Sequence, residues 1–358
     1  MEHPVASGRP KSRHATQLAA SILALTFYSS VAFLTSGCIA ERGCGEGDPE
    51  CSTSGTFALL SVIPRPAFLV GTNQGQIAKS TDGGQAWNVT LLSDPAFFVH
   101  GFGKGNGHII AFGSDGGGTG AFYVTRNLDS WDGPFLLSGV SALTLGGGDG
   151  TSVYAQESGS SNFYRLDPDG GFSNIGSLGS GNGGVQMFQF TAGLWFVGDT
   201  PPDSTIYFGS DPTTLSVPSL APTDQIVDLL LLNGNYLGVG TVDAFATSGG
   251  SLDTWNPLSY GTILTGICTN GNIGIASGPA GLVYTTSNGQ TFNELSGSGI
   301  NTGLGTNLED IACSGESFVV IPLTSGDWAY SGDSGLTWNI ITNPVGAGTP
   351  LTIDHLSL

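Results

Sequence analysis

Positively charged residues are scarce in this chain. Its 358 residues include nine lysines and arginines against 28 acidic residues, and none of the nine follows Arg165. From Cys38 onward the chain carries 27 acidic and six basic residues. Nucleic acids bind surfaces that are positive, and other polyanions are repelled by an acidic surface. The composition therefore excludes a nucleic-acid partner and leaves a cation or a basic protein surface open.

Common catalytic and cofactor patterns are also missing. The chain has no Gly-x-Ser-x-Gly elbow, no phosphate-binding loop and no His-Glu-x-x-His sequence. With five histidines in all, a nucleophilic serine or cysteine has no evident base. His100 and His108 flank an expected hairpin and would face each other across it, without a third metal ligand. No Asp-x-Asp-x-Asp-Gly loop occurs, so Ca²⁺ is a weak prediction, and we expect no cofactor, no metal and no enzyme.

The start of the chain has the pattern of an export signal. Three basic residues precede an apolar run at 18–34, and small residues lead to a cysteine in Leu34-Thr35-Ser36-Gly37-Cys38. This sequence resembles the lipobox of bacterial lipoproteins, in which the cysteine is lipidated and becomes the N-terminus. The resemblance implies a signal peptide over 1–37, a lipid on Cys38 and, because Ile39 is not Asp, an outer-membrane lipoprotein facing the periplasm or the exterior. An uncleaved anchor and a signal cleaved without lipid are the alternatives.

The remaining cysteines form two pairs. Residues 38–56 are polar and typical of a flexible tether, and Cys44 and Cys51 within them are a candidate disulfide, since export leads to an oxidising compartment. Cys268 and Cys313 occupy matching places in consecutive repeats of the body. A disulfide needs Cα atoms within about 7 Å. Because matching positions lie a whole repeat apart, we expect these two to be buried free thiols.

One phrase recurs along the body of the chain. Ser80-Thr81-Asp82-Gly83-Gly84-Gln85-Ala86-Trp87 returns as Ser331-Gly332-Asp333-Ser334-Gly335-Leu336-Thr337-Trp338, with looser copies between them. The spacing divides into six intervals of about 42 residues, a period that indicates stacked or ring-closed units. The 58 glycines favour many short strands joined by turns.

One copy shows the internal structure of the repeat. Short apolar segments at 264–268, 272–277, 281–286 and 291–295 are separated by turn residues. Four strands with their turns fill about 40 residues, the size of one propeller blade. Seven copies occupy residues 57–358. The sequence therefore predicts one all-β domain, a monomeric seven-bladed β-propeller of four-stranded antiparallel blades.

Two segments compete to close this ring. Leu351–Leu356 resembles the opening strand Leu308–Cys313 and would complete the first blade from the C-terminal end. Phe57–Ile63 would fill the same place from the N-terminal end. Closure removes exposed sheet edges. We expect the C-terminal segment to be the closing strand.

The recurring phrase resembles the Asp-box, or bacterial neuraminidase repeat, of propellers that include sialidase-like and assembly-factor-like members. The signature Ser-x-Asp-x-Gly-x-Thr-Trp is matched by Ser80, Asp82, Gly84, Trp87, Ser331, Asp333, Gly335 and Trp338. In that family the boxes fasten hairpins on the rim, away from the ligand. The residue types agree, because Asp accepts from turn N–H groups, Gly allows a left-handed turn and Trp buries a large face. We therefore assign Asp82 and Asp333 structural roles.

Sialidases share this phrase, and the resemblance implies a site in which three arginines hold a carboxylate. The expected ring contains only Arg65, Arg126 and Arg165, and its last four blades contain none. Arg126 and Arg165 adjoin turn motifs, at the wrong edge for a central cluster. Because bidentate arginine is hard to replace in carboxylate recognition, we do not expect sialidase activity.

Acidic residues recur where the second and third strands of a blade would join. They are Asp115, Glu157, Asp199, Asp203, Asp243 and Asp327. Loops on one face of a rigid scaffold often carry binding sites, although aspartate is also a common turn residue. The functional interpretation is an acidic mouth for Ca²⁺, a cationic ligand or a partner's basic patch.

This interpretation supports two functions. The first, which we favour, is a non-catalytic binding or assembly module outside the cytoplasm that docks an envelope protein or a glycan on one propeller face. It would touch the membrane through its lipid anchor only. The second is a carbohydrate-active enzyme, a glycoside hydrolase that uses paired carboxylates on the same face.

Overall fold

A computed structural model describes residues 66–177, 185–199, 205–217, 224–259, 261–292 and 300–356. Contacts divide the chain into two units, Met1–Ile63 and Pro64–Leu358, and all described residues belong to the second. The expected signal peptide and tether, with Cys38, Cys44 and Cys51, lie outside them. Within the described part, no helix has the length and apolar character needed to cross a membrane.

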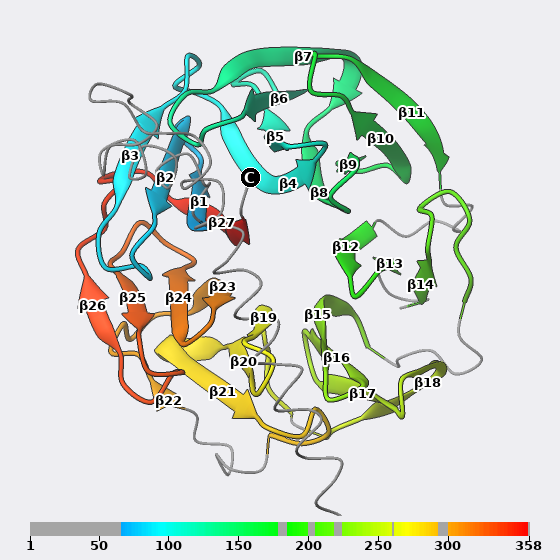
Figure 1. Ribbon diagram of the computed structural model, residues 1–358, viewed down its shortest axis with the longest axis vertical. Helices are drawn as coiled ribbons and strands as arrows, with labels where there is room; N and C mark the ends of the chain where they lie inside the picture. The colour runs from blue at the N-terminus through cyan, green and yellow to red at the C-terminus, as the bar shows by residue number, and fades with distance from the viewer. Residues whose placement is uncertain are drawn as a thin grey trace, which may run out of the picture. The chain divides into compact units, whose positions relative to one another are not determined.

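Seven antiparallel sheets form the blades of a β-propeller, as the sequence predicts (Figure 1). In each blade the first-named strand lies nearest the centre of the ring and the last lies at the rim. The first blade contains β27 (Pro350–Leu356), β1 (Ala67–Thr72), β2 (Gln76–Ser80) and β3 (Asn88–Leu91). The second contains β4 (Phe98–Gly105), β5 (His108–Ser114), β6 (Thr119–Thr125) and β7 (Asp132–Ser141). The third contains β8 (Leu143–Gly148), β9 (Val153–Glu157), β10 (Asn162–Leu166) and β11 (Phe172–Ser177).

The fourth blade has three strands among the described residues, β12 (Val185–Thr191), β13 (Leu194–Asp199) and β14 (Ile206–Gly209). The fifth contains β15 (Ile226–Leu232), β16 (Asn235–Gly240), β17 (Ala244–Ser248) and β18 (Ser251–Pro257). The sixth contains β19 (Gly266–Thr269), β20 (Gly274–Ser277), β21 (Leu282–Thr286) and β22 (Ile300–Asn301), with the 3-10 helix η1 (Pro279–Gly281) after β20. The seventh contains β23 (Leu308–Ser314), β24 (Ser317–Pro322), β25 (Trp328–Ser331) and β26 (Asn339–Ile341).

The C-terminal strand closes the ring, which confirms the expected closing strand. β27 pairs antiparallel with β1, and the register places Ile353 opposite Val70. The first blade therefore takes its innermost strand from the end of the chain and its outer three strands from the beginning of the ring (Figure 1). The alternative segment Phe57–Ile63 lies outside the described residues.

Apolar side chains fill the space between neighbouring blades. At the junction of the seventh and first blades, Phe68 and Val70 pack in one buried cluster with Val319 and Trp328. Trp87 stacks edge-on against Trp328, with 4.9 Å between the ring centroids. Each blade alone would expose such faces, so the apolar burial that stabilises a blade requires its neighbours.

Both close copies of the recurring phrase form the same hydrogen-bonded turn. Ser80 Oγ donates to Asp82 Oδ1 at 2.8 Å, and the N–H of Gly84 donates to Ser80 Oγ at 2.9 Å. Asp82 Oδ1 also accepts the N–H of Ala86 at 3.0 Å, and Trp87 Nε1 donates to the Gly84 carbonyl at 2.9 Å. Gly84 has φ of 92°, a left-handed conformation that favours glycine. The side chains of Ser80, Asp82 and Trp87 thus form hydrogen bonds within their own turn.

The second copy repeats this arrangement. Ser331 Oγ donates to Asp333 Oδ1 at 2.8 Å, and Trp338 Nε1 donates to the Gly335 carbonyl at 3.0 Å. Asp333 accepts Thr337 Oγ1 at 2.5 Å and the Thr337 N–H at 2.9 Å. These hydrogen bonds hold the pKa of the Asp333 carboxyl below its usual value.

Replacing Asp333 with alanine should lower the free energy of unfolding by about 1–2 kcal/mol, because three donors lose a charged acceptor in a partly exposed turn. Denaturant unfolding followed by tryptophan fluorescence measures the change. Asp253→Ala, at an exposed position of β18, is the matched control and should change stability by less than about 0.5 kcal/mol. Equal losses in the two variants would contradict a fastening role for the box.

Candidate functional site

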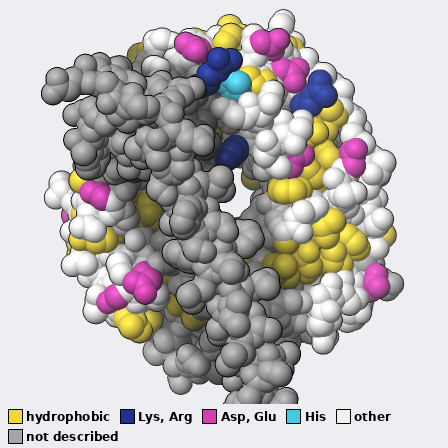
Figure 2. Space-filling view, in the orientation of Figure 1, with side chains coloured by type: hydrophobic (Ala, Val, Ile, Leu, Met, Phe, Trp, Pro, Cys, Tyr) yellow, Lys and Arg dark blue, Asp and Glu magenta, His cyan; other side chains and the backbone are white. Residues whose placement is uncertain are grey.

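A central channel runs between the innermost strands of the seven blades. Its volume is about 850 Å³, and β4, β8, β12, β15, β19, β23 and β27 all contribute to its wall. Figure 2 shows an opening at the centre of the ring. A concave space of this size, lined by a few polar groups, is the usual form of a ligand site.

A β-bulge at the same place on six innermost strands shapes the channel wall. In each of these strands one residue near the start is skipped in the pairing with the next strand. The skipped residues are His100, Thr144, Gln186, Val227, Glu309 and Leu351, and all six line the channel. A bulge redirects side chains at the end of a strand. At this position the repeat therefore places one side chain from each of these six blades in the channel, and the six residues differ from one another.

Three aspartates line the channel on innermost strands. Asp228 accepts the Leu229 N–H through Oδ1 and the Ile267 N–H through Oδ2, both at 2.7 Å. Asp310 accepts the Ile311 N–H through Oδ1 at 2.8 Å and the Ile353 N–H through Oδ2 at 3.2 Å.

The third aspartate, Asp354, accepts the N–H of His355 at 2.7 Å. Asp228 and Asp310 each reach from one blade to the backbone of the next innermost strand.

Burial raises the pKa of all three carboxyls. It raises the pKa of Asp228 to about 7, although the hydrogen bonds from Ile267 and Leu229 lower this pKa. The charge of Asp354 adds to the rise. Burial and then the negative charge of Asp228 raise the pKa of Asp310 well above its usual value. Burial raises the pKa of Asp354 to about 6. The pKa values of Asp228 and Asp310 therefore reflect both desolvation and repulsion between carboxylates, whereas that of Asp354 reflects desolvation.

The other titrating groups in the channel do not offset these charges. Burial raises the pKa of the Glu309 carboxyl and lowers the pKa of the His100 and His355 imidazoles. Both histidines are therefore neutral at and above neutral pH. No lysine or arginine is among the described residues that line the channel.

Side chains near the centre join successive blades. Gln189 of the fourth blade donates to the Leu229 carbonyl at 3.0 Å and accepts the Leu229 N–H at 3.2 Å. Asp228 links the fifth blade to Ile267 of the sixth. Thr265 Oγ1 donates to the Leu308 carbonyl at 2.9 Å, which links the sixth and seventh blades.

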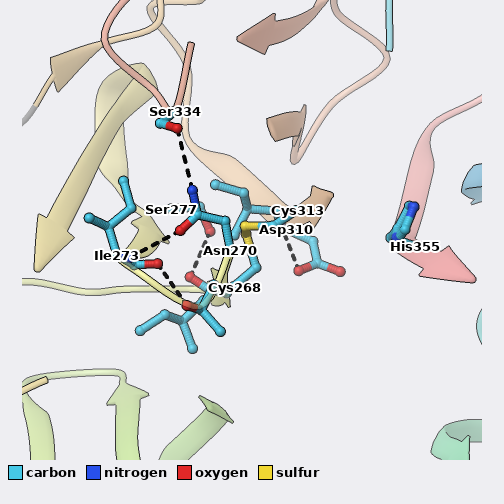
Figure 3. The surroundings of a disulfide bond; sticks show 12 residues. Cys268, Asn270, Ile273, Ser277, Asp310, Cys313, Ser334 and His355 are labelled. Carbon is cyan, nitrogen blue, oxygen red and sulfur yellow. Dashed lines mark hydrogen bonds between the residues drawn. A yellow bond between two sulfur atoms is a disulfide. The ribbon is translucent and has the colours of Figure 1, made fainter. Parts of the chain in front are cut away.

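The prediction that Cys268 and Cys313 are buried free thiols is wrong. The two half-buried residues form a disulfide between β19 and β23, with 5.7 Å between their Cα atoms (Figure 3). Matching positions of neighbouring blades are far apart at the rim, but innermost strands converge around the channel. The spacing between blades therefore depends on distance from the centre, and both cysteines line the channel.

The acidic residues predicted to form a mouth follow or end second strands, but none of the described ones lines the channel. Asp115 Oδ1 accepts the Thr119 N–H at 2.8 Å within its own turn. Asp243 Oδ1 accepts the Ala244 N–H at 2.9 Å, and Asp327 Oδ1 accepts the Asn343 N–H at 3.1 Å. Acidic side chains visible in Figure 2 are spread around that face of the ring.

Two of the predicted acidic residues are buried. Glu157 accepts the Ser141 N–H at 2.8 Å and the Asn162 side chain at 2.9 Å. Burial raises the pKa of this carboxyl, but those hydrogen bonds outweigh it and leave the pKa below its usual value. Asp199 is 3% exposed at the end of β13, and Asp203 lies outside the described residues.

The two histidines of the second blade do not face each other. His108 lies opposite Gly105 at the turn of the hairpin, where Arg126 Nε donates to its Nε2 at 2.6 Å. His100 lies in the bulge near the start of β4 and lines the channel. No group of three or more His, Cys, Asp or Glu residues in the described part of the chain is arranged to hold a metal ion.

The channel aspartates were not among the predicted site residues, although the sequence contains a signal for them. Ile226-Val227-Asp228-Leu229 and Leu308-Glu309-Asp310-Ile311 share an aspartate two residues after an apolar strand start. An aspartate inside an expected buried strand is costly unless its carboxyl is hydrogen-bonded. Its recurrence in equivalent strands was therefore more informative than the acidic residues of the turns.

Comparisons with known proteins support the fold alone. No protein-family model and no curated protein matches the chain. A putative 6-phosphogluconolactonase from Bacteroides fragilis superposes with a TM-score of 0.60 at 12% identity, over 83% of this chain and 99% of that one. The computationally designed Ika8 protein has a TM-score of 0.52 at 14% identity, over 79% and 85%. Apo AztD from Citrobacter koseri has 0.51 at 10% identity, over 82% and 99%.

Proposed function

We propose that this protein is a non-catalytic binding or assembly module that works outside the cytoplasm and docks an envelope protein through a basic segment. The observation that carries the proposal is the channel lining, with carboxyls at Asp228, Glu309, Asp310 and Asp354 and no described lysine or arginine. A cationic group entering the channel would be attracted by these carboxyls and would relieve their mutual repulsion.

Two further observations support an extracytoplasmic place. The Cys268–Cys313 disulfide is of a kind that forms and persists mainly in oxidising compartments. The sequence before the ring has the pattern of an export signal ending at Cys38, which would carry the lipid anchor. An outer-membrane lipoprotein whose ring docks its partner is the arrangement we favour.

A pulldown from the envelope extract of the source organism tests the proposal. The wild-type protein should retain a protein partner at low salt and lose it at high salt, since charge attraction is screened. Glu309→Gln should weaken binding about fivefold, the effect of about 1 kcal/mol from one partly desolvated charge pair. Glu316→Gln, at an exposed position in the turn after β23, is the matched control and should leave binding unchanged. Salt-insensitive binding, or equal loss in both variants, would refute docking at the channel.

The second candidate is a glycoside hydrolase. Burial raises the pKa of Asp228 to about 7, and a general acid needs such a value at neutral pH. An enzyme should hydrolyse members of a glycoside panel and lose about a hundredfold or more of that activity in Asp228→Asn. Turnover with that loss would replace the docking proposal, whereas a glycan bound without turnover would keep a binding module with a different ligand.

A further inference from the structure

The strand that closes the ring is joined to the last blade by an aspartate. Asp310 of β23 accepts the backbone N–H of Ile353 in β27 at 3.2 Å. β27 is the C-terminal strand of the ring and pairs with β1 on its other side. Its backbone therefore belongs to the first blade, while the Asp310 side chain connects it to the last blade.

The junction on the opposite side of β23 is held covalently. The Cys268–Cys313 disulfide joins β19 to β23, and Thr265 Oγ1 adds a hydrogen bond to the Leu308 carbonyl. In Figure 3 the Asp310 carboxyl points away from the disulfide, toward the side on which His355 of β27 lies. Of the two innermost strands beside β23, β19 is therefore held by a covalent bond and β27 is not.

The titrating groups around Asp310 are three carboxyls and two imidazoles. β27 brings Asp354 and His355, β23 itself brings Glu309, and Asp228 and His100 line the same channel from β15 and β4. Strands β19, β20 and β24 and the helix η1 bring no carboxyl, imidazole or amine, since the cysteine of β19 is in the disulfide. Above neutral pH this surrounding contains several negative charges and no positive one.

We propose that Asp310 is a pH-sensitive latch on the ring. While the channel aspartates are protonated, β27 stays docked against β23 and the propeller is closed. When they ionise together, their repulsion loosens β27 from β23, while the disulfide keeps β19 and β23 joined. The protein then opens at the junction between its last blade and its closing strand.

The pH range follows from the direction of the shifts. A carboxyl whose pKa is raised on folding stabilises the folded state at low pH, and this contribution is lost as the pH rises through the folded value. The pKa of Asp354 is about 6, that of Asp228 is about 7 and that of Asp310 is raised by burial and by its neighbour. The latch should hold at about pH 5 and loosen by about pH 8.

Hydrogen exchange on the whole protein tests the latch. Protection factors, corrected for the intrinsic pH dependence of exchange, should fall at least about tenfold more between pH 5 and pH 8 for β27 amides than for β15 and β16 amides, whose protection follows global stability. Asp310→Asn should abolish this local fall. Asp253→Asn, at an exposed position in β18, should retain it.

A second variant keeps the test decisive if Asp310→Asn fails to fold. Asp354→Asn removes a neighbouring charge while the Asp310–Ile353 hydrogen bond remains, so the loosening of β27 should move to higher pH. Unchanged protection of β27 in the wild type, an equal fall in every blade, or the same fall in Asp310→Asn would each overturn the latch.

Discussion

Replacing Cys268 and Cys313 together with serine should lower the free energy of unfolding by about 4 kcal/mol. The disulfide closes a loop of 45 residues, and loss of that constraint increases the entropy of the unfolded chain by about this amount. It also removes the covalent bond between two blades at the channel. Denaturant unfolding of the wild type and the double variant measures the difference.

A reductant supplies the control for this result. It should lower the unfolding midpoint of the wild type toward that of the double variant and leave the double variant unchanged. The expected pair Cys44 and Cys51 would be reduced in both proteins and so cancels from the comparison. An equal effect of reductant on both proteins would show that the Cys268–Cys313 bond does not carry the stability.

The second large effect concerns pH. The free energy of unfolding should fall as the pH rises from about 4 to about 8, by about 4 kcal/mol at most for Asp228, because its pKa rises from 3.8 to about 7 on folding. Asp228 is half-buried, so solvent screening of its carboxyl should reduce this figure. Asp228→Asn should flatten the pH profile, since the amide does not titrate.

The profile should also fall on the acid side. Asp82, Glu157 and Asp333 have pKa values below their usual ones, so the stability they contribute is lost as the pH falls through those values. Stability should therefore be greatest in mildly acidic solution. Equilibrium unfolding at a series of pH values measures it, and Glu316→Gln is the control that should follow the wild type. A profile that rises steadily to pH 8 would contradict the raised pKa values of the channel aspartates.

Local sequence patterns were sufficient for much of the fold. The phrase at Ser80–Trp87 and Ser331–Trp338 marks the turn between the third and fourth strands, and its period indicates the number of blades. The similarity of Leu351–Leu356 to Leu308–Cys313 identified the closing strand, because both occupy the innermost position of a blade. These features depend on neighbours in the chain or on repetition, and a sequence contains both directly.

The predicted acidic mouth shows where this reasoning fails. Asp115 and Asp243 lie in the expected connections, yet their carboxyls accept backbone N–H groups nearby. A turn aspartate with a local acceptor role and one that faces a ligand look alike in sequence. To distinguish the two kinds of aspartate, one must know the direction in which each side chain points, and this depends on the packed structure.

By itself, the sequence determined the class of fold, the blade repeat, the closing strand and the acidic balance, because each follows from order and composition along the chain. Only the tertiary structure decided that Cys268 reaches Cys313 and that Asp228, Asp310 and Asp354 share one channel. The physical reason is the convergence of the innermost strands around the centre of the ring. Residues separated by whole blades in sequence meet there, and the distances between them cannot be calculated from the length of the repeat.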